Sequence, residues 1–125
     1  MPAVILTNEN FEQTIENNDI VFLDFWASWC GPCKTFAPIF EAASEKHSGI
    51  VFGKINTEEQ ITLAQRFQIR SIPTIMIYRE KIPLFMQPGA LSAAALDDMI
   101  GKVRELDMED VRRQIAEHEE KQKTA

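Results

Sequence analysis

The chain contains only two cysteines, and they lie two residues apart in the run Trp29-Cys30-Gly31-Pro32-Cys33-Lys34. Two thiols at this spacing can close a small disulfide ring and open it again. Pro32 suits the first turn of a helix, where its missing N–H donor is not needed. A thiol at a helix start has a lowered pKa, because the free N–H groups there stabilise the thiolate. The run therefore predicts a redox-active pair with Cys30 as the nucleophile and Cys33, one turn further in and more buried, as the resolving thiol.

Three other roles of a C-x-x-C pair must be weighed: a zinc site, a structural disulfide and an inert buried pair. A structural zinc site needs four ligands, but His47 and His118 lie far apart and lack the spacing of a ligand pair. We expect no metal site and place both histidines at the solvated surface. The first residues lack the basic region of a signal peptide, so we expect a cytoplasmic, reducing location. There a lone cysteine pair is more often catalytic than structural.

Composition limits the class of protein further. A length of 125 residues predicts one domain, and 45% hydrophobic with 26% charged residues is typical of a soluble globular chain. The net charge of −6 disfavours a nucleic-acid partner, which requires a basic face. No run approaches the roughly 18 apolar residues of a membrane-spanning helix. We therefore expect neither nucleic acid nor membrane as a partner.

The secondary-structure elements predicted around the cysteines alternate between strands and helices. Apolar runs predict strands over residues 3–6, 20–26, 50–56, 74–78 and 82–86, the last two as a hairpin. Helical spacing predicts four helices. The first ends near residue 17, the second spans 33–47 and contains Pro38, the third spans 58–67 with Thr57 as its cap, and the fourth begins near residue 91. Such alternation predicts an α/β fold whose central sheet has helices on both faces.

Asp24 interrupts the apolar run from Val21 to Trp26. A carboxylate inside a buried strand is costly when charged, so its pKa rises and it can exchange protons near neutral pH. The sequence therefore marks Asp24 as a candidate acid–base group. The alternative is a structural carboxylate satisfied by hydrogen bonds.

Five blocks of the sequence form a recognisable pattern: DFWASWCGPCK at 24–34, AP at 37–38, KIN at 54–56, IRSIPT at 69–74 and PGAL at 88–91. In this order they resemble the thioredoxin family, and the resemblance covers residues 3–105. The resemblance implies the thioredoxin fold: a central mixed β-sheet flanked by helices on both faces. Residues 1–106 would form that domain, and residues 107–125 a charged, helical C-terminal extension.

The resemblance also implies an activity. A protein of this family is a protein-disulfide reductase: Cys30 would attack a substrate disulfide and Cys33 would release the product. Asp24 would transfer protons to and from Cys33, and Lys54 would tune Asp24, unless the lysine reaches water instead. Thioredoxin reductase would recycle the pair with electrons from NADPH. The chain itself would bind no cofactor.

A docking surface for protein substrates follows from the same resemblance. The Ile72-Pro73 bond would be cis and would face the cysteines, with the backbone of Ile72 pairing with an extended substrate. The surface would comprise Trp29, Gly31, Pro32, Ile72, Pro73, Gly89 and Ala90. For Trp29 the alternative is an aromatic side chain packed in the core. The alternative for the whole chain is a binding or scaffold module that keeps the fold and docks partners through this surface or the C-terminal helix.

Two local features depart from the family pattern. Ser28 stands where an acidic residue commonly precedes the active-site tryptophan, which changes the charge near the docking surface. The hairpin turn Arg79-Glu80-Lys81 lacks the usual glycine, so we expect a longer or differently shaped turn.

The C-terminal extension is the third departure. Asp107 can start a helix, and Met108, Val111 and Ile115 would share one face. The expected i,i+4 ion pairs are Glu109–Arg113 and Glu117–Lys121. Three apolar residues are too few for a second core. We expect a charged helix packed lightly on a monomeric domain, the alternative being a contact with a partner or a second copy.

Overall fold

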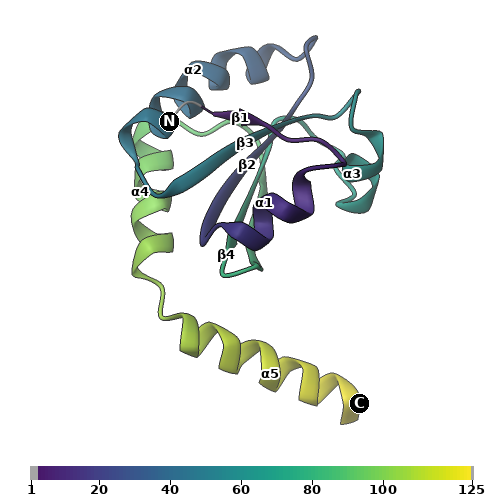
Figure 1. The fold of residues 1–125 in the computed structure, drawn as a ribbon, viewed down its shortest axis with the longest axis vertical. Coiled ribbons are helices and arrows are strands. Elements are labelled where there is room, and N and C mark those ends of the chain that lie inside the picture. The colour runs from purple at the N-terminus through teal and green to yellow at the C-terminus, as the bar shows by residue number, and fades with distance from the viewer. Residues whose placement is uncertain (1–2, 125) are drawn as a thin grey trace.

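The computed structural model describes residues 3–124, in which strands and helices alternate (Figure 1). The strands are β1 (Val4–Ile5), β2 (Ile20–Trp26), β3 (Ile50–Asn56), β4 (Thr74–Arg79) and β5 (Ile82–Pro88). The helices are α1 (Phe11–Asn17), α2 (Gly31–Lys46), α3 (Ile61–Arg66), α4 (Ala93–Glu105) and α5 (Met108–Thr124). Within these residues no helix is long and apolar enough to cross a membrane.

The five strands form one mixed sheet in the order β1-β3-β2-β4-β5. β1, β3 and β2 run parallel, whereas β4 is antiparallel to β2 and β5 is antiparallel to β4. Phe25 at the carboxyl end of β2 therefore pairs with Thr74 at the amino end of β4. The loop that follows β2 and the loop that precedes β4 meet at the same edge of the sheet. Cys30 lies in the first of these loops and Ile72 and Pro73 in the second.

Each face of the sheet buries its own hydrophobic cluster. Phe22 of β2 belongs to the cluster under α2 and α4, while Val21, Leu23 and Phe25 belong to the cluster on the side of α1 and α3 (Figure 1). Successive side chains of a strand point to opposite faces. Asp24 therefore lies on the same face as Phe22, the face that α2 covers.

α2 begins earlier than the sequence predicted, at Gly31 instead of residue 33, because Cys30 itself is the N-cap. Pro32 lies in the first turn, where a residue without an N–H donor fits. α3 begins later than predicted, at Ile61. Thr57 does not cap it; its hydroxyl donates instead to the carbonyl oxygen of Trp26 at 3.1 Å and ties the ends of β2 and β3 together.

The hairpin turn between β4 and β5 is short. Only Glu80 and Lys81 connect the strands, and both have positive φ angles, 51° and 67°. Positive φ at both central residues is the geometry that matches strand twist in two-residue hairpins, even though glycine or asparagine usually supplies it. The N–H of Glu80 also donates to the carbonyl oxygen of Asp19 at 2.8 Å. The missing glycine has therefore not lengthened the turn.

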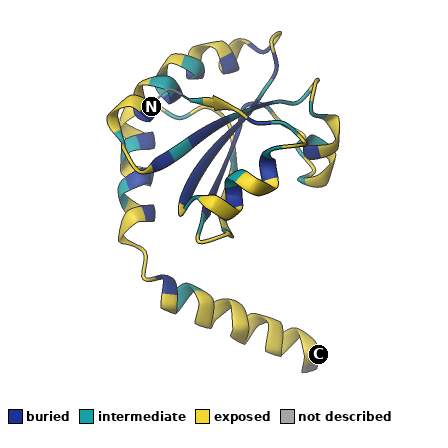
Figure 2. Cartoon of the chain, in the orientation of Figure 1, coloured by how far each residue is buried: buried dark blue, intermediate teal, exposed yellow. Residues whose placement is uncertain are grey.

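The extension forms the predicted helix, α5, and the rest of the chain holds it at its first turns. Asp107 accepts hydrogen bonds from the N–H groups of Glu109 and Asp110, at 3.1 and 3.2 Å. Met108 is buried, whereas the helix beyond it is mostly exposed (Figure 2). The side chain of Arg113 pairs with Asp110, three residues before it, and not with Glu109 as predicted. The ion pair of Arg113 is therefore with its i,i+3 neighbour.

Candidate active site

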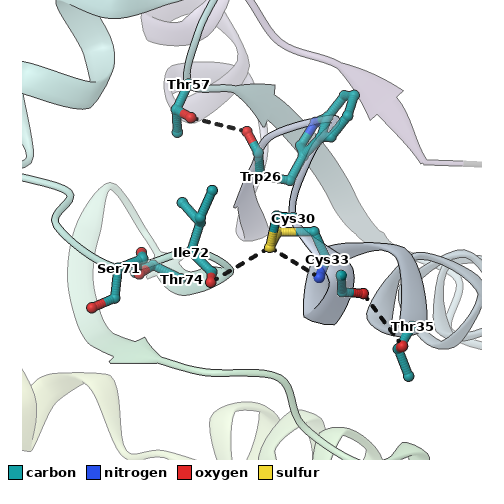
Figure 3. The surroundings of a disulfide bond; sticks show 9 residues. Trp26, Cys30, Cys33, Thr35, Thr57, Ser71, Ile72 and Thr74 are labelled. Atoms are coloured by element: carbon teal, nitrogen blue, oxygen red, sulfur yellow. Dashed lines mark hydrogen bonds between the residues drawn. A yellow bond between two sulfur atoms is a disulfide. The ribbon is translucent and has the colours of Figure 1, made fainter.

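Cys30 and Cys33 are joined by a disulfide at the start of α2, with their Cα atoms 5.2 Å apart (Figure 3). The N–H of Cys30 donates to the carbonyl oxygen of Ala27 at 3.2 Å, which fixes the loop that follows β2. The N–H of Cys33 points at the sulfur of Cys30, 3.2 Å away. Cys30 thus occupies the cap position at which helix N–H groups stabilise a thiolate.

The exposure of the two cysteines differs from the sequence prediction. Cys30 was expected to be the exposed member, but it is only 4% exposed and Cys33 is 3% exposed. In this structure the sulfur of Cys30 is bonded to that of Cys33 and is almost closed off from solvent. That sulfur also lies 3.6 Å from the carbonyl oxygen of Ile72.

The loop before β4 lies directly against the cysteines. The Ile72–Pro73 bond is cis, as the resemblance implied. The hydroxyl of Thr74 donates to the carbonyl oxygen of Ser71 at 2.5 Å, and the N–H of Gly89 donates to the carbonyl oxygen of Pro73 at 2.8 Å. Gly89 has a φ of 99°, a conformation that glycine adopts without strain. These bonds fix the Ile72–Pro73 segment between Cys30 and the end of β5.

The residues predicted to dock substrates mostly lie at the surface. Trp29 is 68% exposed and is therefore not packed in the core. Four other members of the predicted surface are also exposed: Gly31, Pro32, Gly89 and Ala90. Ile72 is partly buried and Pro73 is buried. The structure thus brings the loop after β2, the loop before β4 and the end of β5 together around the disulfide.

Asp24 is fully buried, and neither of its carboxyl oxygens has a hydrogen-bond partner among residues 3–124. The prediction that it faces the core is confirmed, and the alternative of a carboxylate satisfied by protein groups is wrong. Burial raises the pKa of Asp24 to about 7, and the charge of Lys54 partly opposes that rise. Lys54 lies beside Asp24 in the register of β2 and β3. Its ammonium group also lies 4.9 Å from the centroid of the Trp26 ring.

A cavity of about 200 Å³ connects these groups. Asp24, Cys33 and Lys54 all line it. Five residues that the sequence did not assign to this place line it as well: Trp26, Ala27, Ser28, Lys34 and Ala37. The sequence spacing could have indicated two of these residues. Trp26 shares a strand face with Asp24, and Ala37 lies one helical turn after Cys33. Ser28 therefore borders the buried carboxyl group as well as the predicted docking surface.

The histidines lie away from this site. His118 is exposed on α5, as predicted. His47 is partly buried instead of solvated: its Nε2 lies 2.9 Å from Asp97 of α4, and Lys46 contacts the same carboxylate at 2.7 Å. Hydrogen bonds from Lys46 and His47 hold the pKa of Asp97 below its usual range. Among residues 3–124, no three His, Cys, Asp or Glu side chains are grouped so that they could hold a metal ion.

Comparison with known proteins shows to which protein family this chain belongs. The family model described as Thioredoxin matches residues 2–102. This chain belongs to the thioredoxin family. It is similar to "Putative thioredoxin 2" of Streptomyces coelicolor, with 56% identity over 117 residues that cover 94% of this chain and 87% of that protein. It is 41% identical to a thioredoxin of Buchnera aphidicola over 76% of this chain and 90% of that protein.

Solved thioredoxin structures have the same fold. Plasmodium falciparum thioredoxin matches with a TM-score of 0.73 and 32% identity, covering 80% of this chain and 97% of its own. Spinach chloroplast thioredoxin F matches with a TM-score of 0.76 and 30% identity, covering 82% and 94%. The predicted thioredoxin fold is confirmed. With its cysteine pair in the active-site position, the chain is a thiol–disulfide oxidoreductase that reduces protein disulfides.

Proposed function

We propose that Cys30 is the attacking thiol and Cys33 the resolving thiol of this reductase. The Cys30 thiolate attacks one sulfur of a substrate disulfide, which breaks that bond and releases the first substrate thiolate. Cys33 then loses its proton and attacks the sulfur of Cys30 in the mixed disulfide. The second substrate thiolate leaves, and the Cys30–Cys33 disulfide remains. Two electrons pass to the substrate. The observation that supports this order is the position of Cys30 at the N-cap of α2, with the Cys33 N–H aimed at its sulfur.

Asp24 accepts the Cys33 proton in this proposal. Both residues line the same cavity, and its volume of about 200 Å³ accommodates water that can carry the proton between them. A pKa of about 7 lets the carboxyl group take up and release protons near neutral pH. Lys54 tunes this group, because its positive charge favours the ionised carboxylate.

The substrate docks as an extended segment against the exposed surface around the disulfide. Trp29, Gly31 and Pro32 form one side, while Gly89 and Ala90 form the other. The backbone of Ile72 lies between them and pairs with the main chain of the substrate, as an edge strand does. Main-chain pairing is tolerant of sequence, so this surface suits many protein substrates.

A thioredoxin reductase using NADPH restores the dithiol in this proposal. The reductase holds its own cofactors, and this chain binds none. We place the reaction in the cytoplasm, where a reducing pool keeps a cysteine pair in the thiol form that attacks substrates. A thioredoxin reductase assay with NADPH and insulin measures the complete cycle.

Cys30→Ser is expected to abolish insulin reduction in that assay, because a hydroxyl group cannot form the mixed disulfide. Thr35→Ala, an exposed change in the same helix, serves as the matched control and should keep full activity. Full activity of Cys30→Ser would overturn the mechanism. Loss of activity on deletion of residues 107–125, with Cys30→Ser unaffected, would instead support a binding module.

A further inference from the structure

A groove of about 520 Å³ separates α5 from the edge strand β5. Ile82 and Leu84 of β5 line one side, and Val111 and Ile115 of α5 line the other. β4 begins at the active-site edge with Thr74 and ends beside the Glu80 turn, so this groove lies at the far end of the sheet from Cys30 (Figure 1). The redox chemistry makes no use of it.

α5 is fixed at one end and projects from the body of the molecule (Figure 2). Arg112 forms an ion pair with Glu80 of the hairpin turn, and Arg79 donates to the carbonyl oxygen of Leu106 at 3.1 Å. Beyond these two contacts the apolar face of α5 continues to Ile115, which is 38% exposed. A helix held in this way keeps one wall of an apolar groove in place without filling it.

The charges of α5 alternate in blocks along the helix. An acidic block is followed by a basic block, a second acidic block and a second basic block: Glu109 and Asp110; Arg112 and Arg113; Glu117, Glu119 and Glu120; Lys121 and Lys123. Two such helices side by side in parallel would place like charges together. Most of these charges lie on the side of α5 away from the groove, but Arg112 and Glu119, two helical turns apart, share the flank beside Ile115. In antiparallel order Arg112 of one helix faces Glu119 of the other, so this pair is complementary to the same pair of a second copy.

We propose that a second copy of this chain occupies the groove, with the two α5 helices antiparallel and related by a two-fold axis beside Ile115 and Ala116. Arg112 then lies opposite Glu119 of the second copy, and each such pair occurs twice by symmetry. Glu119 itself lines the groove. The two Ile115 side chains meet near the axis and cover the apolar side chains of β5. This arrangement departs from the monomer expected from the sequence.

Both active sites stay accessible in this dimer, because the groove and the disulfide lie at opposite ends of the sheet. Activity per chain is therefore expected to be the same in the dimer and the monomer. The dimer depends on exposed ion pairs, so salt should weaken it. Neither expectation depends on which cysteine attacks the substrate.

A charge-reversal pair tests the proposal by sedimentation velocity at low salt over a range of protein concentrations. The wild-type chain should reach about twice the chain mass of 14.3 kDa. The first variant combines Glu80→Lys with Arg112→Glu, which keeps the ion pair within the chain but reverses its sign. The second variant is Glu119→Lys. Each variant alone should be monomeric because like charges then face each other, and an equimolar mixture should recover the dimer.

Swapping the Glu12–Arg66 ion pair, which links α1 to α3, is the matched control and should leave the dimer intact. Circular dichroism and insulin reduction report whether each variant is folded. A monomeric wild-type chain at every concentration would overturn the proposal. Dimers formed by each variant alone, or a mixture that stays monomeric while both variants are folded, would overturn the antiparallel arrangement.

Discussion

The buried carboxyl group of Asp24 makes the stability of this fold depend on pH. Its pKa rises from 3.8 to about 7 on folding, chiefly because burial disfavours the charged form. Between these two values the folded chain binds a proton that the unfolded chain has released. The contribution of Asp24 to the free energy of unfolding therefore falls as the pH rises from about 4 to about 7, and stays level above that. A shift of this size corresponds to about 4 kcal/mol.

Replacing Asp24 by alanine removes this penalty. We expect Asp24→Ala to raise the free energy of unfolding by about 2–4 kcal/mol at pH 8, less than the full electrostatic cost because packing is lost. At pH 4 the gain should nearly vanish, since the wild-type carboxyl group is then neutral in the fold. Urea denaturation at the two pH values measures the difference. An equal effect at both would show that the carboxyl group is not the cause.

The close packing of β3 against Leu6 can be tested by a substitution at Gly53. A Cβ atom on Gly53 of β3 would lie 2.5 Å from Leu6 Cδ1 and 2.8 Å from Leu6 Cγ. Leu6 is buried in the core and cannot move aside freely. Gly53→Ala should therefore lower the free energy of unfolding by about 1–3 kcal/mol.

Gly101 in α4 is the control for that substitution, because a Cβ atom there meets nothing within 4 Å. Gly101→Ala should raise stability by about 0.5–1 kcal/mol through helix propensity. Chemical denaturation of both variants at one pH compares them. A stable Gly53→Ala chain would mean that Leu6 can repack.

The strands and long helices could be predicted because their apolar periodicity reflects the burial that forms them. β2 and β3 have the predicted bounds, and α2 differs by two residues at its start. Local patterns failed where a distant partner determines the conformation. Thr57 bonds to Trp26, 31 residues away, instead of capping α3, and His47 packs against Asp97, 50 residues away.

The candidate site could be predicted only in part, because some of its features depend on residues that are distant in the sequence. Cys30, Cys33 and Asp24 stood out by residue type and local context. The cavity that Asp24 shares with Cys33 and Ser28 could not, because the packing of α2 on the sheet creates it.

At the scale of the whole molecule, the two ends of the sheet carry different features. The disulfide, the cis Ile72–Pro73 loop and the exposed Trp29 lie at one end. The hairpin turn, α5 and the groove lie at the other. The chain can therefore associate through one end while it exchanges disulfides at the other.

Mixed-disulfide trapping tests the central claim, that Cys30 attacks and Cys33 resolves. Cys33→Ser and Cys30→Ser variants are each reduced and incubated with oxidised insulin, and intact mass spectrometry then measures the covalent complexes. The Cys33→Ser chain should accumulate a mixed disulfide through Cys30, because no second thiol releases the product. The Cys30→Ser chain should form little. A complex that accumulates mainly on Cys30→Ser would contradict the account.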